Sequence, residues 1–269
     1  MAVLVLAASA HAQKLPLGGL PPGKVALVIQ SHHDDHTWQF GFGGFIAKLN
    51  DAGFTSYFIR TTNDEKDSRD GWGRGDQINH RESVEATRHL GMKEVISLNW
   101  RNDHMDSVPI KEIRAQYILL IRKLRPDVLM TWNPWGHYDR NPDHRKVARA
   151  AGEAAWMAGL SNVHPEHIAA GLAPHRVPRV YYTQRHDYGR GYVPNIAIQI
   201  APTQVRRAEA AYHAHKNVRA NEPANFMESA MRATGAKHGV DFAEEFYYRD
   251  EWDHLPGLVD YLKAEVKTR

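Results

Sequence analysis

The 269-residue sequence predicts an α/β fold in which helices cover both faces of a mostly parallel central sheet. Short runs rich in β-branched and other apolar residues alternate along the chain with segments in which apolar residues have helical spacing. Several of the short runs are apolar throughout, as is typical of strands that are buried on both faces. Apolar residues make up 42% of the chain, which is ordinary for a protein with a substantial core.

The first 144 residues supply the elements on which this prediction depends. Strands are predicted at residues 24–30, 54–62, 94–100 and 127–133, and helices at residues 38–50, 78–90 and 109–124. Gly91 is a C-cap signal for the second of these helices. A fourth helix is predicted to begin with Asn141 as N-cap, Pro142 at the first helical position and Asp143 in the first turn. The polar residues 63–76 are predicted to form a long loop.

The composition excludes several classes of protein and of site. The formal net charge is +3, and no segment has the dense Lys/Arg clustering that nucleic-acid binding needs. There are no cysteines, so disulfides, thiolate metal sites and a cysteine nucleophile are excluded. The 17 histidines are unusual and indicate metal or proton chemistry, with histidine and carboxylate as the available metal ligands.

The first 23 residues differ in character from the rest of the chain. A short apolar run ends in Ala10-His11-Ala12, which resembles the cleavage site of a secretory signal, and a Pro/Gly-rich linker follows. We therefore predict a signal-peptide remnant and linker at residues 1–23, one domain at residues 24–269, and export from the cytoplasm, with a cytoplasmic location as the alternative. The apolar run is too short to cross a bilayer, so no stable membrane insertion is expected.

Ionisable residues gather where two of the predicted strands end. The run His32-His33-Asp34-Asp35-His36 follows the first strand, and a second polar segment, residues 133–144, follows the fourth. Ligand sites of parallel α/β sheets lie at the carboxyl ends of the strands, so we expect both clusters at the same edge of the sheet. The alternative is a pair of solvated charged loops, and the coincidence of two such clusters argues against it.

The two clusters contain the ligands for one metal ion. His32 and Asp35 are three residues apart, close enough in a tight turn to converge on one ion, and His144 lies at the start of the fourth helix. Two imidazoles and one carboxylate form a zinc site of the catalytic type, with one position open for water. The same ligands also suit Fe(II), Co(II) or Mn(II). Asp34 then remains free beside the water as a general base.

Two sequence motifs carry a resemblance to a known family. "SHHDDH" before a glycine-rich helix, and "NPDHRKVARA" about a hundred residues later, resemble the AHPDDE and HPDH motifs of the LmbE-like (PIG-L) zinc deacetylases. The resemblance implies a Rossmann-like three-layer sandwich, zinc held by His32, Asp35 and His144, and Asp34 as the base. It also implies removal of an acetyl group from an N-acetylglucosamine unit of a small molecule, lipid or oligosaccharide.

Three positions depart from the motifs of that family. His33 replaces a proline, His36 replaces a glutamate, and Asn141 replaces the histidine that helps to stabilise the developing oxyanion in the family. Loss of one such donor costs about a hundred- to a thousandfold in rate. The candidates for the missing donor are the Asn141 amide, His137, Tyr138 and His215.

His215 has two interpretations. Helical spacing places it on one face with Val205, Ala208 and Tyr212, which is as typical of a core histidine as of one at the rim of a site. The resemblance favours the rim of the active site, because the segment "YHAHKNV" matches a helix of the family.

The sequence thus predicts a metal-dependent hydrolase that removes an N-acyl group, foremost N-acetyl, from an amino-sugar conjugate through a zinc-activated water. One alternative is a degenerate family member that binds a glycan without cleaving it, although such a protein needs no general base at Asp34. The other is a metallo-β-lactamase-like hydrolase. Its H-x-H-x-D-H motif would begin at Ser31, and its β sandwich disagrees with the predicted fold.

Overall fold

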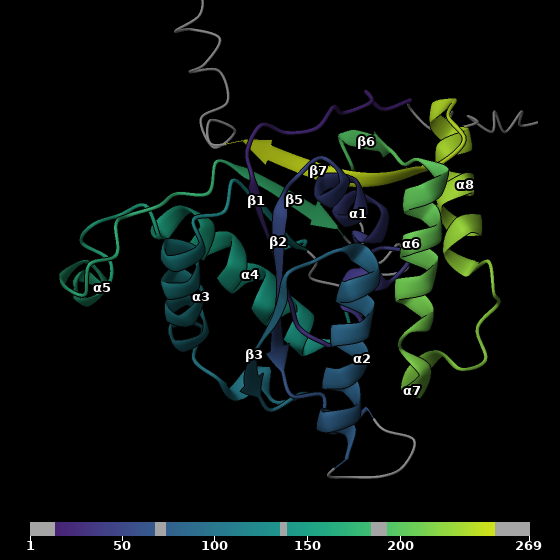
Figure 1. Ribbon diagram of the computed structural model, residues 1–269. Coiled ribbons are helices and arrows are strands. Elements are labelled where there is room, and N and C mark those ends of the chain that lie inside the picture. The colour runs from purple at the N-terminus through teal and green to yellow at the C-terminus, as the bar shows by residue number, and fades with distance from the viewer. Residues whose placement is uncertain (1–13, 68–73, 135–138, 184–192, 251–269) are drawn as a thin grey trace, which may run out of the picture.

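A single mixed sheet forms the centre of the protein (Figure 1). The computed structural model describes residues 14–67, 74–134, 139–183 and 193–250, and within them seven strands pair in the order β3-β2-β1-β4-β5-β7-β6. The strands are β1 (Val25–Gln30), β2 (Thr55–Thr62), β3 (Glu94–Trp100), β4 (Val128–Trp132), β5 (Arg179–Thr183), β6 (Ile196–Gln199) and β7 (Ala243–Asp250). Only β7 runs antiparallel to its neighbours, so the prediction of a mostly parallel sheet is confirmed.

The strand order reverses at β1. Ala26 pairs with Ser56 of β2 on one side and with Val128 of β4 on the other. The chain proceeds outwards from β1 through β2 to β3, and then outwards in the opposite direction through β4 to β5. A crevice forms at such a point beyond the carboxyl ends of the two central strands. The loops after β1 and β4 both open into this region.

Helices cover both faces of the sheet, which confirms the three-layer sandwich (Figure 1). The four helices on one face are α1 (Gly43–Asp51), α2 (Gly75–Leu90), α6 (Pro202–His213) and α8 (Phe226–His238). The other face carries α3 (Ile110–Leu124) and α4 (Pro142–Met157). The short elements are α5 (Pro165–Ala169), α7 (Lys216–Arg219) and the 3₁₀ turns η1 (Asp35–Thr37) and η2 (Met105–Ser107).

Alternate residues of the central strands divide the core in two. Ala26 and Val28 of β1 pack in the core that contains α1 and α6, whereas Leu27 and Ile29 pack in the core that contains α3 and α4. This division follows from the pleat, because successive side chains of a strand point to opposite faces. It explains why β1 is apolar throughout.

The first helix begins later than predicted. The sequence predicts a helix from Trp38, but α1 begins at Gly43. Trp38 has extended backbone (ψ 161°), and its indole N–H donates a hydrogen bond to Asp34 Oδ2 at 2.9 Å. The segment before the helix also passes so close to η1 that a Cβ on Gly41 would lie 2.6 Å from the carbonyl oxygen of His36. The boundary prediction was wrong because these contacts override the helical spacing.

The second helix begins earlier than predicted, at Gly75, and ends as expected with Gly91 in the left-handed conformation (φ 75°). The predicted loop at residues 63–76 is correspondingly shorter. Its middle, residues 68–73, lies outside the described residues.

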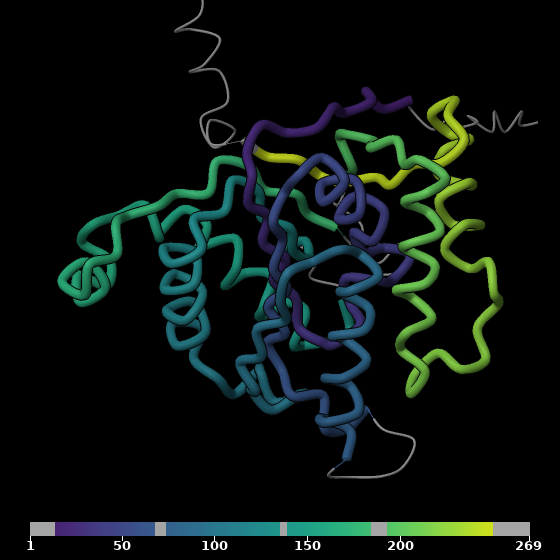
Figure 2. The backbone as a smooth tube through the Cα atoms, in the orientation of Figure 1, coloured from purple at the N-terminus to yellow at the C-terminus, as the bar shows by residue number. Residues whose placement is uncertain are grey.

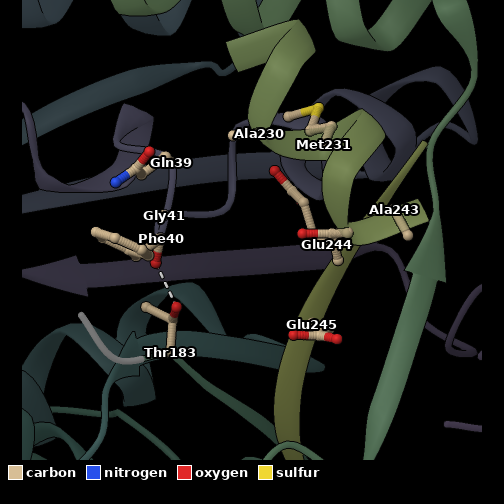
Figure 3. A pocket seen from close by; sticks show the side chains of 10 residues that line it. Gln39, Phe40, Gly41, Thr183, Ala230, Met231, Ala243, Glu244 and Glu245 are labelled. Carbon is tan, nitrogen blue, oxygen red and sulfur yellow. Dashed lines mark hydrogen bonds between the residues drawn. The ribbon is translucent and has the colours of Figure 1, made fainter. Parts of the chain in front are cut away.

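A carboxylate from the far end of the chain caps α1 (Figure 3). The backbone N–H groups of Gly44 and Phe45 donate to the two oxygens of Glu244, at 2.9 and 2.8 Å. Nearby, the Thr183 hydroxyl of β5 donates to the carbonyl of Phe40. Strands β5 and β7 therefore fix the segment that joins η1 to α1.

Residues that precede β1 also belong to the ordered structure. Leu17 forms a parallel bridge with Ala197 of β6, supported by hydrogen bonds from Gly18 N to Ala197 O (2.8 Å) and from Ala197 N to Pro16 O (3.0 Å). Figure 2 shows this segment passing along the end of the sheet that carries β6 and β7. Of the predicted signal-peptide remnant and linker at residues 1–23, residues 1–13 lie outside the described residues. Within the described part of the chain, none of the helices combines the length and apolar character needed to cross a bilayer.

Candidate metal centre

The loops after β1 and β4 bring the three predicted metal ligands together. His32 Nδ1 lies 3.0 Å from His144 Nε2 and 3.4 Å from Asp35 Oδ2, and His144 Nε2 lies 3.3 Å from Asp35 Oδ1. All three residues are buried, with at most 6% of their surface exposed. His144 reaches the centre because it occupies the first turn of α4, whose N-cap Asn141 accepts a hydrogen bond from Asp143 N at 2.9 Å.

This arrangement fits a tetrahedral metal ion. Ligand atoms bound at about 2.0–2.1 Å to a tetrahedral zinc ion lie roughly 3.4 Å from one another. The two imidazole nitrogens lie 3.0 Å apart, His144 Nε2 lies 3.3 Å from Asp35 Oδ1, and His32 Nδ1 lies 3.4 Å from Asp35 Oδ2. These separations are close to that value. Two imidazole nitrogens and one carboxylate are also the ligands of a catalytic zinc site, which keeps one position for water or substrate. His32, Asp35 and His144 therefore form a candidate centre for a divalent metal ion.

Each ligand is oriented by a further side chain. His32 Nε2 lies 3.3 Å from Asp143 Oδ2, and His144 Nδ1 lies 2.8 Å from Asp139 Oδ2. The Trp132 indole N–H at the end of β4 donates to Asp35 Oδ2 at 3.2 Å. A carboxylate behind a ligating imidazole fixes which ring nitrogen faces the metal. In this centre Nδ1 of His32 and Nε2 of His144 face the metal position.

The charges at the centre favour a cation. Burial, the largest single influence, lowers the pKa of both imidazoles, but the carboxylates around them together outweigh it, so that Asp35 with Asp143 raises the pKa of His32 and Asp35 with Asp139 raises that of His144. Burial conversely raises the pKa of a carboxyl, yet His144 and His32 hold the pKa of Asp35 well below its usual value. The negative potential that attracts protons to the two imidazoles also attracts a metal ion.

Asp34, the predicted base, lies beside the metal ligands and forms a buried ion pair. Arg219 Nη2 donates to Asp34 Oδ2 at 2.7 Å, and Trp38 donates to the same oxygen. Burial acts to raise the pKa of Asp34, but the positive charge of Arg219, with that of His33, outweighs it and holds the pKa below its usual value. The lowered pKa keeps the Asp34 carboxylate ionised. Its side chain keeps 12% of its surface exposed, so the carboxylate is also accessible.

Arg219 is held from several sides. Its guanidinium also donates to the Asp34 carbonyl (3.0 Å) and to Thr37 Oγ1 (2.9 Å). It stacks over the rings of Tyr212 and Trp38, at 4.1 and 4.9 Å from their centroids. These contacts fix the backbone and side chain of Asp34 together.

The other predicted site residues lie in different surroundings. Asn141 uses its side-chain oxygen as the N-cap of α4. His137 and Tyr138 lie outside the described residues. His215 is fully buried, not at an exposed rim, and it packs against the rings of His33 and His36. It precedes α7 and lies beyond the end of α6, so the predicted helix over Val205, Ala208, Tyr212 and His215 ends two residues early.

Sequence reasoning missed three supporting residues and part of the role of a fourth. Trp132, Asp139 and Arg219 were not singled out, and no local pattern marks an arginine 185 residues from its partner. Asp143 was explained as a first-turn acid alone. Its carboxylate also lies against His32 and accepts backbone N–H groups of Asp103 and Met105 (2.7 and 3.2 Å), which ties the loop before η2 to the metal centre.

Comparison with known proteins shows which family this part of the chain resembles. Residues 27–155 match the model of the PIG-L family, described as GlcNAc-PI de-N-acetylase. That range contains most of β1, all of β2 to β4, most of α4 and all three candidate metal ligands. This part of the chain is therefore similar to the PIG-L family.

Individual proteins are also similar to this chain in sequence and in structure. A diacetylchitobiose deacetylase of Thermococcus kodakarensis is 32% identical over 170 residues, which are 61% of this chain and 62% of that protein. The chain thus matches about three fifths of the length of that relative. The structure of N,N'-diacetylchitobiose deacetylase from Pyrococcus horikoshii superposes with a TM-score of 0.73 at 25% identity, covering 88% of each chain.

The fold also occurs in a protein with a different activity. The structure of a 4-carboxy-2-hydroxymuconate hydratase from Pseudomonas putida KT2440 gives a TM-score of 0.68 at 18% identity, over 84% of this chain and 96% of that one. Fold alone therefore does not determine the reaction. It does exclude the metallo-β-lactamase alternative, because a single, mostly parallel sheet replaces the β sandwich which that family requires.

Proposed function

We propose that this protein is a zinc-dependent N-deacetylase that acts on an N-acetylglucosamine unit of a small molecule or oligosaccharide. The observation that carries the proposal is the buried His32–Asp35–His144 centre with the ionised Asp34 beside it. Two imidazoles and a carboxylate suit zinc, and the relatives named diacetylchitobiose deacetylase support an N-acetylated amino sugar as substrate.

The residues of this chain divide the chemistry between them. His32, Asp35 and His144 would hold the metal, which when bound lowers the pKa of a water ligand and polarises an amide carbonyl. Asp34 accepts the proton of the attacking water and passes it to the leaving amine. Arg219 and Trp38 keep the Asp34 carboxylate ionised and oriented for the first of these transfers. The Asn141 amide and His137 are the proposed donors to the oxyanion.

The first test measures metal content and acetate release on the same preparations. Wild-type protein saturated with Zn²⁺ should release acetate from N-acetylglucosamine or diacetylchitobiose, and His144→Ala should lose both the zinc of this centre and the activity. His104→Ala, an exposed histidine after β3, is the matched control and should keep both. Sugar binding without acetate release by the zinc-loaded protein would instead favour the glycan-binding alternative.

Asp34→Asn separates proton transfer from metal binding. The variant keeps His32, Asp35 and His144, so its zinc content should equal that of the wild type. Loss of a general base reduces turnover by about 10²- to 10⁴-fold, and we expect a reduction of that size in kcat. Asp106→Asn, which neutralises an exposed carboxylate on η2, should leave kcat unchanged. Undiminished turnover in Asp34→Asn would remove Asp34 from the mechanism.

A further inference from the structure

A second group of potential metal ligands lies next to the first centre and shares no residue with it. His33, Glu82 and His215 each bring one donor atom to within 4.8 Å of the others. They come from the loop after β1, from the middle of α2 and from the residue that precedes α7. His33 and His215 are fully buried, and their rings lie edge to face with centroids 5.3 Å apart.

The imidazoles of this group lack hydrogen-bond partners among the described residues. Both ring nitrogens of His33 and of His215 are buried and unpaired, and so are both nitrogens of the adjacent His36. A buried polar atom without a hydrogen bond destabilises the fold, so buried imidazoles are normally paired. His33 and His36 are also two of the positions at which this chain departs from the family motif.

We propose that His33, Glu82 and His215 bind a second divalent transition-metal ion, which cross-links the loop after β1 to α2 and to the start of α7. Two imidazoles and one carboxylate suit Zn²⁺, and also Co²⁺ and Ni²⁺. Ligand atoms around a tetrahedral zinc ion lie roughly 3.4 Å apart, so shifts of about 1 Å bring this group to the required spacing. The role of this ion is structural, because it joins three segments that are distant in the sequence.

The surroundings of the three ligands suit a bound cation. His33 Nδ1 lies 3.7 Å from Asp64 Oδ2 and 3.9 Å from Asp34 Oδ1. Both carboxylates lie beyond hydrogen-bond distance of Nδ1, and their negative charge favours a cation bound at Nε2 of this imidazole. The His215 side chain is fully buried, and neither of its ring nitrogens has a hydrogen-bond partner among the described residues. Arg219 is itself paired with Asp34.

An open cleft gives the ion a route to this group. The cleft has a volume of about 300 Å³ and lies where α2 packs beside α6 and α7 (Figure 1). Its lining includes Glu82, together with Ala214 and Lys216, the two neighbours of His215. Glu82 is half-buried, so its carboxylate connects the cleft with the buried imidazoles. This route does not pass through the His32–Asp35–His144 centre.

The test counts zinc in the full chain by mass spectrometry, after saturation with Zn²⁺ and removal of the excess by gel filtration. We expect two zinc ions per chain in the wild type, one in His144→Ala, one in Glu82→Gln and none in the double variant. Glu82→Gln is the preferred substitution, because a glutamine keeps an oxygen acceptor for the backbone N–H of Asn217, which now lies 2.9 and 3.1 Å from the carboxylate oxygens. His215→Asn provides a second variant with the same expected loss.

A surface group of histidines supplies the matched control. His164, Glu166 and His167 also bring donor atoms within 4.8 Å, but they lie on α5 and its N-cap and are partly exposed. Replacing both histidines by alanine should leave two zinc ions per chain. A wild-type count of one that falls in His144→Ala and not in Glu82→Gln would overturn the second site and leave the proposed function intact.

Thermal unfolding gives an independent readout. Zn²⁺ should raise the melting temperature of His144→Ala by several degrees, because an ion that binds only the folded state stabilises it. The same addition should have no effect on the double variant His144→Ala/Glu82→Gln. Equal increases in the two proteins would contradict the proposal, since the ion would then bind elsewhere.

Discussion

Asp34 and Arg219 form a buried ion pair beside the candidate metal centre. Arg219 touches the carboxylate, the carbonyl of the same residue and the hydroxyl of Thr37. Removal of one partner of a buried pair leaves the other charge without compensation, which costs about 3–5 kcal/mol. The pair therefore has two effects, on the orientation of the proposed base and on the stability of the fold.

A double-mutant cycle separates these effects. Arg219→Met should destabilise the protein by roughly 3 kcal/mol, because the Asp34 carboxylate loses its cation. Adding Asp34→Asn should recover part of that loss, because the neutral amide needs no cation. Chemical denaturation of the four proteins measures the coupling, and zinc content should stay unchanged in all four. If the losses of unfolding free energy in the two single variants add up to the loss in the double variant, Arg219 contributes only by packing against Tyr212 and Trp38.

At the level of elements, sequence patterns identified the strands and helices of the first 132 residues. β1 to β4 were predicted within about two residues, as were α3 and the start of α4, because uninterrupted apolar runs and capping residues mark them locally. The start of α1 was wrong because its boundary depends on Trp38 and Glu244, and the second of these lies 200 residues from Gly44. Boundaries set by tertiary contacts leave no local signal.

The Glu244 cap of α1 predicts a dependence of stability on pH. Burial raises the pKa of Glu244 from 4.5 to about 7, against the lowering effect of the two N–H donors. Between these values the folded state holds a proton that the unfolded chain releases. The contribution of Glu244 to the free energy of unfolding is therefore largest below a pH of about 4.5. This contribution is lost as the pH rises to about 7.

Glu244→Gln should remove this dependence. The difference in unfolding free energy between wild type and variant should fall by up to about 3 kcal/mol across that interval, because glutamine does not ionise. Denaturation curves at several pH values measure the difference, with Glu94→Gln, an exposed acid at the start of β3, as the control for losing one carboxylate. A difference that stays constant with pH would contradict the assigned cause.

For the whole molecule, the metal centre joins two halves of the sheet. Its candidate ligands follow β1 and β4, so the three side chains come together only when these two strands pair. Chelation of zinc should therefore lower the melting temperature of the wild type. Zinc at 100 times its dissociation constant contributes about 2.7 kcal/mol. His144→Ala should show a smaller shift, measured by differential scanning calorimetry, and equal shifts would exclude this centre as the source.

The sequence predicted the proximity of the candidate metal ligands better than it predicted the residues that support them. His32, Asp35 and His144 could be expected to lie together because the carboxyl ends of parallel strands meet at one edge, so position along the chain implied proximity. Arg219 does not follow a predicted strand, and its contact with Asp34 depends on how α6 packs against η1. Likewise, β7 enters the sheet antiparallel between β5 and β6, an order that its own residues do not specify.

The distance between the candidate metal ligands along the sequence also has a consequence for folding during synthesis of the chain. His144 follows His32 by 112 residues, so a growing chain presents His32 and Asp35 long before the third ligand leaves the ribosome. Two ligands alone would hold a metal ion weakly, so the proposed centre would capture its ion firmly only when β4 has joined β1 and α4 has formed its first turn. In the proposed enzyme, metal uptake would thus be a late event that reports a correctly paired sheet centre.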